Sequence, residues 1–200
     1  MKNKLIVFFS LLTLFVTAQN INQDKVIKRS NFIYISPIDL FLKTFEIGYE
    51  RNLKNNHAFA VTGGFKFDKT NETITRLGGT AEVQYKVNLL YSEGPKNIVI
   101  RPYSVFTYFA PYLSYRYEEI NESINSEVNP PENSFIHSGF GGVGFGFRLT
   151  GLENRFSLNA YAGGGLKYSD ITGDQKYNDF WDVGYTGFAP KLSLQMGITF

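Results

Sequence analysis

The chain has 200 residues, with 20 Lys and Arg against 18 Asp and Glu, and it contains no cysteine. The missing cysteine excludes a disulfide framework, a thiolate metal site, a cysteine nucleophile and a lipid-modified N-terminal cysteine. The near balance of charge gives no sign of a nucleic-acid surface, so we expect no nucleic-acid partner. A content of 19 Phe, 13 Tyr and 19 Gly with one Trp favours strands over helices.

Residues 1–18 are typical of an export signal. Lys2 and Lys4 precede the apolar run Leu5 to Val16, and small residues follow up to Ala18, where a signal peptidase would cut. The run has 12 residues, against the ~20 of a membrane-spanning helix. We therefore expect a mature chain that starts at Gln19 without a helical anchor. Removing the signal takes two of the 20 basic residues and no acidic one, which leaves 18 minus 18, a net charge of zero.

Strict alternation of apolar and polar residues is the main signal in the rest of the chain. In residues 76–92 the odd positions are apolar or small and the even positions are mostly polar, and residues 155–169 and 191–200 repeat the pattern. A period of two predicts strands with one apolar and one polar face. A soluble sandwich would show the same alternation, with its apolar faces in the core.

Eight such segments follow in chain order. They are residues 30–36, 44–51, 57–68, 76–91, 98–117, 136–150, 155–169 and 183–200. Short links (52–56, 92–97, 151–154) alternate with longer ones (69–75, 118–135, 170–182), as in transmembrane barrels. We predict an all-β, closed antiparallel up-and-down transmembrane β-barrel of about eight strands over residues 31–200, after a short periplasmic segment at 19–30. In the first hairpin, IDLFLK at 38–43 is apolar for a loop and predicts either a bulged strand end or a helical turn.

The leader, the alternating segments and the terminal LSLQMGITF resemble the small outer-membrane barrels of the OmpA and OmpX type, and the uncharacterised barrels common in Bacteroidota. The resemblance implies export to the periplasm, a place in the outer membrane of a Gram-negative bacterium and contact with outer-membrane lipids. It also implies that the barrel-assembly machinery recognises the last strand. It brings no catalytic residues with it. The residues that match the assembly signal are Leu194, Met196, Ile198 and Phe200.

Gly139, Gly141 and Gly144 match the pattern G-x-G-x-x-G. A dinucleotide site needs a helix after these glycines, whereas here a strand and a turn follow. We interpret the region as a barrel strand in which Gly142, Gly144 and Gly146 leave one wall of the lumen without side chains. Phe140 has the opposite phase in this interpretation, which predicts a bulge at Gly141-Gly142.

Strand phase also predicts which charged residues face the lumen. An eight-stranded barrel has room only for its own side chains, so we expect a paired network that satisfies itself. The alternative is that the glycine wall leaves a narrow channel for small solutes. The predicted lumen residues are Glu46, Glu50, Lys66, Asp68, Glu82, Lys86, Arg148, Lys167 and Lys191.

Catalysis is a further alternative, because some outer-membrane lipid-modifying enzymes are small barrels. Here the only His and Ser near one another are His137 and Ser138, and neighbours on a strand point to opposite faces. The histidine therefore cannot activate the serine, and we place it in the lumen or at the rim, with His57 at a periplasmic turn. We predict no catalytic residue, no cofactor and no metal site.

The long links are the remaining candidates for function. Residues 118–135 hold five Glu and no base, and residues 170–182 hold four Asp and one Lys, so we expect an acidic extracellular rim. Such a rim is either solvated, mobile loop or a surface that docks a cation or a basic partner. We predict a non-enzymatic structural, binding or assembly component with an envelope or extracellular protein partner. The candidate contacts are Glu118, Glu119, Glu122, Glu127, Asp174, Asp179 and Trp181.

A belt of tyrosines at the membrane interface is also predicted, because aromatic residues lie near the ends of the predicted strands. Its candidate members are Tyr49, Tyr85, Tyr91, Tyr115, Tyr117 and Tyr168.

Overall fold

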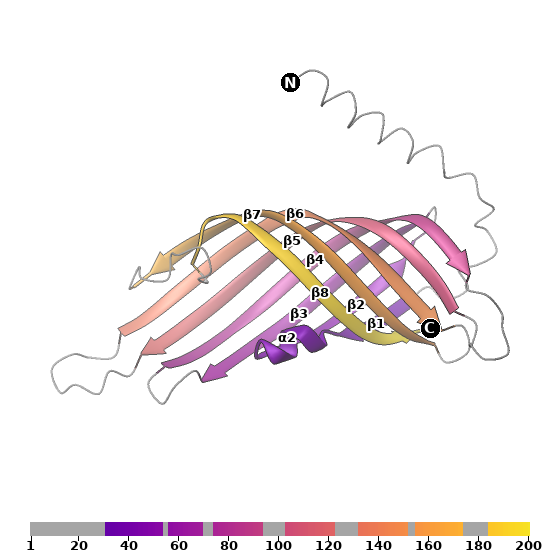
Figure 1. Cartoon of the computed structure of the whole chain (residues 1–200). Coiled ribbons are helices and arrows are strands. Elements are labelled where there is room, and N and C mark those ends of the chain that lie inside the picture. The colour runs from indigo at the N-terminus through magenta and orange to yellow at the C-terminus, as the bar shows by residue number, and fades with distance from the viewer. Residues whose placement is uncertain are drawn as a thin grey trace, which may run out of the picture.

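The computed structural model describes residues 31–53, 56–69, 74–93, 103–122, 132–151, 155–173 and 184–200. The predicted export signal and the segment 19–30 lie outside these ranges. Within them, eight strands form one closed ring in which each strand pairs with its neighbours in sequence and β1 pairs with β8 (Figure 1). All pairings are antiparallel, so the predicted up-and-down barrel is confirmed and the sandwich is excluded.

The elements run in the order predicted, with one short helix added. Their bounds are β1 (Asn31–Ile35), α2 (Pro37–Phe41), β2 (Thr44–Asn52), β3 (His57–Lys69), β4 (Ile74–Glu93), β5 (Tyr103–Glu122), β6 (Glu132–Gly151), β7 (Phe156–Thr172) and β8 (Gly187–Thr199).

The ring closes at its two terminal strands. β1 pairs with β8 from Phe32 opposite Thr199 to Ile35 opposite Met196. Just beyond, Asn31 and Phe200 exchange two backbone hydrogen bonds of 3.0 Å. The strand ends at the termini therefore meet at one end of the barrel, where the C-terminus is marked in Figure 1.

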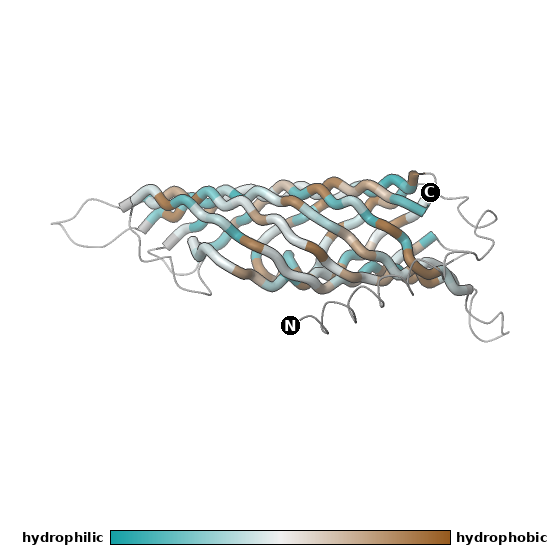
Figure 2. The backbone as a smooth tube through the Cα atoms, turned by 90° about the horizontal axis from the view of Figure 1, so that it is seen from above, coloured by the Kyte–Doolittle hydropathy of each residue, from teal (hydrophilic) through white to brown (hydrophobic). Residues whose placement is uncertain are grey.

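The barrel is apolar outside and polar inside. Along β3, Phe59, Val61 and Phe65 are exposed on the outer face, whereas Ala60 and Thr62 are buried on the inner face. Burial alternates in the same way along β1, β2 and much of β7 and β8, and hydrophilic and hydrophobic residues are interspersed along the strands (Figure 2). A soluble protein would bury its large apolar side chains, so this surface suits lipid. Among the described residues, no helix is long and apolar enough to cross a membrane.

The tallest strands are longer than the sequence pattern indicated. β5 continues to Glu122 instead of ending at residue 117, and β6 begins at Glu132 instead of residue 136. The pairs Ile120 with Ser134 and Glu122 with Glu132 continue the ladder through residues that the acidic composition had assigned to a loop. The start predicted for β5, residues 98–102, lies outside the described ranges.

Strand length also makes the barrel wall uneven. β4, β5 and β6 have 20 residues each, whereas β1 has five. A membrane-spanning strand needs about 9–11 residues. Strands β4, β5 and β6 are therefore longer than the apolar core of a membrane requires, whereas β1 is shorter than it requires.

The predicted bulge at Gly141-Gly142 is wrong. Gly142 lies opposite Tyr112 and Gly141 opposite Leu113 in an uninterrupted register with β5. Phe140 keeps the inward phase, and its ring packs edge-on against Tyr112, with ring centroids 5.3 Å apart. Phe140 therefore needs no bulge, because the lumen itself accepts an aromatic ring.

A bulge does occur in β4, between Asn88 and Leu90. The bulge reverses which face of the sheet the following residues point to. Tyr91 lies opposite Phe106 of β5, and Phe106 lies opposite Arg148 of β6. Because residues opposite one another share a face, Tyr91 points into the lumen like Arg148. The belt prediction is thus wrong for Tyr91. The other predicted belt tyrosines keep the outward phase of their strands: Tyr49, Tyr85, Tyr115, Tyr117 and Tyr168.

The first hairpin contains the helical turn that was one of the two alternatives. α2 starts with Pro37 at its first turn, a position that proline favours because it needs no N–H donor there. Lys43, directly after the helix, has a φ of 59°, which turns the chain back into β2. α2 contacts β2 on one side and β8 on the other.

Candidate functional site: the charged lumen

A buried ion cluster crosses the lumen in the half nearer the termini. Glu50 on β2 accepts a hydrogen bond of 2.7 Å from Lys86 Nζ on β4 and another from Arg148 Nη2 on β6. All three side chains are buried. Because strands β2, β4 and β6 contribute one group each, the cluster joins widely spaced parts of the wall.

Aromatic rings pack against this cluster. Lys86 Nζ lies 4.7 Å from the centre of the Tyr108 ring, and the Arg148 guanidinium lies 4.9 Å from that of Phe32. Cations placed over aromatic faces gain electrostatic energy, more so when they are removed from water. Tyr34, also buried, has its hydroxyl 2.8 Å from Thr62 Oγ1.

The lumen glycines make room for tyrosine rings. A Cβ atom on Gly146 would lie 2.5 Å from Cζ of Tyr108, and one on Gly142 would lie 2.8 Å from the Tyr112 hydroxyl. Gly48 faces the ring of Tyr34 in the same way. At these positions the space beside the glycine is occupied by a tyrosine ring from another strand and, at Gly142, also by the backbone of β7, which favours the filled lumen over the alternative of an open glycine wall.

A second cluster surrounds Glu82 on β4. Its carboxylate is ion-paired with Lys191 of β8, and Gln84 Nε2 donates a 2.7 Å hydrogen bond to it. Tyr161 on β7 donates another, of 3.1 Å. Lys191 Nζ also lies 4.6 Å from the ring centre of Tyr112. Glu82 thus has three donors from three strands.

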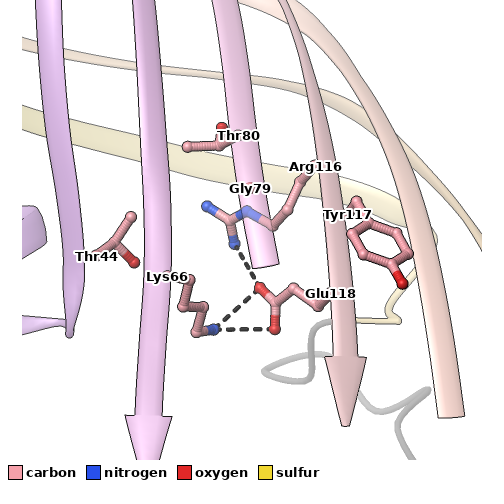
Figure 3. A pocket seen from close by; sticks show the side chains of 7 residues that line it. All are labelled: Thr44, Lys66, Gly79, Thr80, Arg116, Tyr117 and Glu118. Atoms are coloured by element: carbon pink, nitrogen blue, oxygen red, sulfur yellow. Dashed lines mark hydrogen bonds and ion pairs between the residues drawn. The ribbon is translucent and has the colours of Figure 1, made fainter. Parts of the chain in front are cut away.

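A third cluster lies at the mouth, in the half of the barrel away from the termini (Figure 3). Lys66 Nζ is 3.0 Å from both carboxylate oxygens of Glu118, and Arg116 Nη1 is 3.7 Å from one of them. Thr44 and Thr80 line the same pocket, whose volume of about 10 Å³ has room for about one water molecule.

Glu118 was predicted as a loop contact, and this is wrong. Its side chain is only 1% exposed and points into the lumen. The cause is the greater length of β5, which continues the inward phase of Ser114 and Arg116 to Glu118. Glu119 also lies within β5, on its outer face, and Glu122 is the last residue of that strand. The other predicted contacts, Glu127, Asp174, Asp179 and Trp181, lie outside the described residues.

The nine charged residues assigned to the lumen all keep the inward phase. Glu50, Lys86 and Arg148 share one cluster, and Glu82 and Lys191 share another. Asp68 pairs with Lys43 near the end of β3. The remaining ones, Glu46, Lys66 and Lys167, are half-buried in the part of the lumen nearer the mouth.

Several lumen residues that complete these clusters were not predicted from the sequence. Arg116 shares the phase of Glu118, so strand parity would have found it had β5 been extended correctly. Tyr108, Tyr112 and Tyr161 share the inward phase, but a tyrosine on a barrel strand also fits the outer belt. Asp39 was missed because it lies on α2, where a period of two does not apply.

The two histidines lie apart from any serine nucleophile. His137 is on the outer face, with Nδ1 2.6 Å from the Tyr115 hydroxyl. Ser138 points inward, with Oγ 2.8 Å from Ser169 Oγ. The predicted opposite orientation is confirmed, and His137 occupies the outer rim instead of the lumen. His57, the first residue of β3, stacks on Tyr85.

No group of three or more His, Asp or Glu side chains in the described ranges is arranged to hold a metal ion. The four residues of the predicted assembly signal share the outer face of the barrel at its closing strand. They are Leu194, Met196, Ile198 and Phe200.

No family model matches the chain, and no curated protein matches it. Among solved structures, the chain is similar to the crystal structure of a major outer membrane protein from Thermus thermophilus. The two share 11% sequence identity and a TM-score of 0.45, over 85% of this chain and 99% of that one.

Proposed function

We propose that the protein is a non-enzymatic outer-membrane β-barrel of the small OmpA and OmpX type, in a Gram-negative bacterium. Its lumen is closed by its own side chains. It acts as a structural, binding or assembly component through the end of the barrel that carries the long links. The support is a closed ring with an apolar outer face and a charged interior, the arrangement that outer-membrane barrels use.

The observation that carries the closed lumen is the Glu50 cluster. Lys86 is fully buried and Arg148 nearly so, and both cations are bound to one carboxylate and covered by aromatic rings. A solute passing this level would have to separate buried charges from their partner, which is strongly unfavourable. The tyrosine rings beside Gly48 and Gly146 also support a filled lumen over the channel alternative.

Conductance in planar bilayers tests the closed lumen. We expect the wild-type protein to insert without steady single-channel current. A variant with both Tyr34→Ala and Tyr108→Ala should conduct, because it loses the two rings that face Gly48 and Gly146. Arg116→Ala, at the mouth, serves as the matched control and should stay silent. Steady current from the wild-type protein would replace this proposal with the channel.

Extraction in mild detergent tests the binding role. We expect a partner protein at near-equal amount, lost when residues 124–130 between β5 and β6 are deleted and kept when residues 95–98 between β4 and β5 are deleted. Recovery of a solitary barrel would argue against a binding role. Turnover of membrane lipid that disappears in His137→Ala would instead establish the enzyme alternative.

A further inference from the structure

The barrel wall has a seam between β8 and β2. β8 pairs with β7 from Gly187 to Ile198, but on its other edge it pairs with β1 only from Met196 to Thr199. Among the described residues, 187–195 of β8 therefore have a strand on one side alone. Thr44–Glu46 of β2 likewise extend beyond the last residue that β1 pairs with, Ile47. β1 thus connects β2 and β8 by backbone pairing at the end of the barrel near the termini. Beyond Ile35, no strand lies between β2 and β8.

This seam lies within the apolar outer surface. Phe188 and Leu192 on β8 and Phe45 on β2 are all exposed on the outer face. In lipid, an uncovered strand edge is costly because its N–H and C=O groups have no water to bind. Pro190, within the free stretch of β8, fits an edge position, since proline has no N–H to donate.

α2 is the element that covers the seam. It contacts both β2 and β8, and Ser36 Oγ, at its start, is bonded to Asp39 and lies 3.1 Å from the carbonyl oxygen of Leu194. No residue of α2 is buried, and Phe41 is 88% exposed. The helix thus lies on the seam as a cover held near its two ends, by Ser36 on one side and the Lys43–Asp68 ion pair on the other.

Charged groups of both signs lie behind this cover. Asp39 on α2 and Glu46 on β2, which we call the acidic pair, both adjoin Ser36: its hydroxyl bonds to the Asp39 carboxylate, and its backbone N–H donates a 3.4 Å hydrogen bond to the Glu46 carbonyl. The charges of Asp39, Lys191 and Glu82 all act on Glu46. Within the described part of the chain, Glu46 makes no ion pair. Lys191 is paired with Glu82, and because its ammonium has three N–H donors it can donate to a second anion while this pair stays intact. The seam therefore offers one cation with N–H donors to spare, beside two carboxylates that make no ion pair within the described residues.

We propose that the seam is a lateral lipid site, closed by α2, that holds a phosphoethanolamine headgroup with its phosphate on Lys191 and its ammonium on the acidic pair. A zwitterionic headgroup matches this charge pattern, whereas an anionic one would face the acidic pair unpaired. The primary ammonium also supplies three N–H donors for the carboxylates. The acyl chains stay outside, along Phe45, Phe188 and Leu192. This inference goes beyond the proposed function, and it rests only on the barrel lying in lipid.

Native mass spectrometry of the full chain tests the headgroup. The protein is equilibrated in micelles that contain equal phosphatidylethanolamine, phosphatidylcholine and phosphatidylglycerol. We expect one retained phosphatidylethanolamine, lost in Lys191→Met and in Glu46→Gln, and kept in Lys191→Arg and in Arg116→Gln, a control at the mouth. Each variant is first checked for the gel shift between unboiled and boiled samples that a folded barrel gives. Equal retention of the three lipids, or retention by folded Lys191→Met, would overturn the site.

Cysteine labelling tests the lateral route, since the chain has no cysteine of its own. Ser193 and Ser157 are both buried on the inner face, Ser193 behind the seam and Ser157 behind fully paired strands. A maleimide carried on a lipid headgroup should label Ser193→Cys and leave Ser157→Cys unlabelled. Labelling of Ser193→Cys by a water-soluble charged maleimide alone would show entry from the mouth and refute the lateral route. Membrane fractionation separates this failure from failure of the proposed function, because a barrel outside the membrane fraction would contradict both.

Discussion

The lumen contains the same ionic arrangement twice, in two settings. Glu50 in the half nearer the termini and Glu118 at the mouth each lie between a lysine and an arginine. At Glu50 the lysine is 0% exposed, whereas at Glu118 the arginine is 48% exposed. Burial decides what such a cluster does: away from water a missing partner is costly, while near water it is replaced by solvation. We therefore regard the first as a closure and the second as a cluster whose cations are reached by water.

Removing the buried carboxylate should have the largest effect. Glu50→Ala leaves Lys86 and Arg148 buried without a counter-charge, and we expect a loss of about 3–5 kcal/mol in unfolding free energy. Urea unfolding in detergent micelles, followed by the gel shift between folded and unfolded protein, measures it. A loss below about 1 kcal/mol would mean that water reaches this cluster and that the lumen is open.

A glycine substitution beside the cluster should rank second. Gly146→Ala forces a methyl group to within 2.5 Å of the Tyr108 ring and 2.7 Å of the backbone oxygen of Ala160, and overpacking of this kind costs about 1–3 kcal/mol. Gly139→Ala is the matched control on the same strand, because nothing lies within 4 Å of its added Cβ atom on the outer face. Equal stability of the two variants in the same urea assay would show that the Tyr108 ring and the backbone at Ala160 move to accommodate the added methyl group.

At the mouth, Glu118→Gln should cost less than either. Lys66 keeps partial access to water with its side chain 17% exposed, and the amide still accepts a hydrogen bond, so we expect about 1 kcal/mol. The comparison with Glu50→Gln in the same assay isolates the effect of burial. A larger loss for the mouth variant would reverse the assignment of the two clusters.

The smallest effect should come from Arg116→Gln. The guanidinium lies 3.7 Å from Glu118 and is half-exposed, and such pairs contribute about 0–1 kcal/mol. That contribution should vanish in 1 M salt, where the screening length is about 3 Å, while the cost of Glu50→Ala persists. A salt-independent effect would indicate that Arg116 has a further contact within the barrel.

Strand parity made most of this lumen predictable. Once a segment is known to be a strand, an inward Glu50 requires Gly48 and Glu46 to point inward as well, and the same rule relates Arg148 to Gly146. The alternation of apolar and polar residues therefore carried the fold and the faces of the charged residues. It could not say which charges pair, because that depends on the register between strands and not on any one strand.

Two features were hidden from the sequence. The acidic composition after Tyr117 resembled a loop, although backbone pairing with β6 continues to Glu122 regardless of side-chain polarity. The bulge after Asn88 reverses the phase of Tyr91 without any glycine or proline to mark it. The lumen glycines could not be interpreted from the sequence alone. A glycine shows that a side chain is missing, but not which side chain from another strand occupies that space.

The hydrogen bonds between Asn31 and Phe200 have a kinetic consequence. They join the described residues that are furthest apart along the chain. Closing the ring therefore costs the conformational entropy of bringing together the two ends of the whole domain. Pairings of such high contact order form slowly. Until then β1 and β8 are open edges, which in water invite pairing with other chains. The time between synthesis of the last strand and its pairing with the first is thus the interval in which this barrel is most exposed to aggregation.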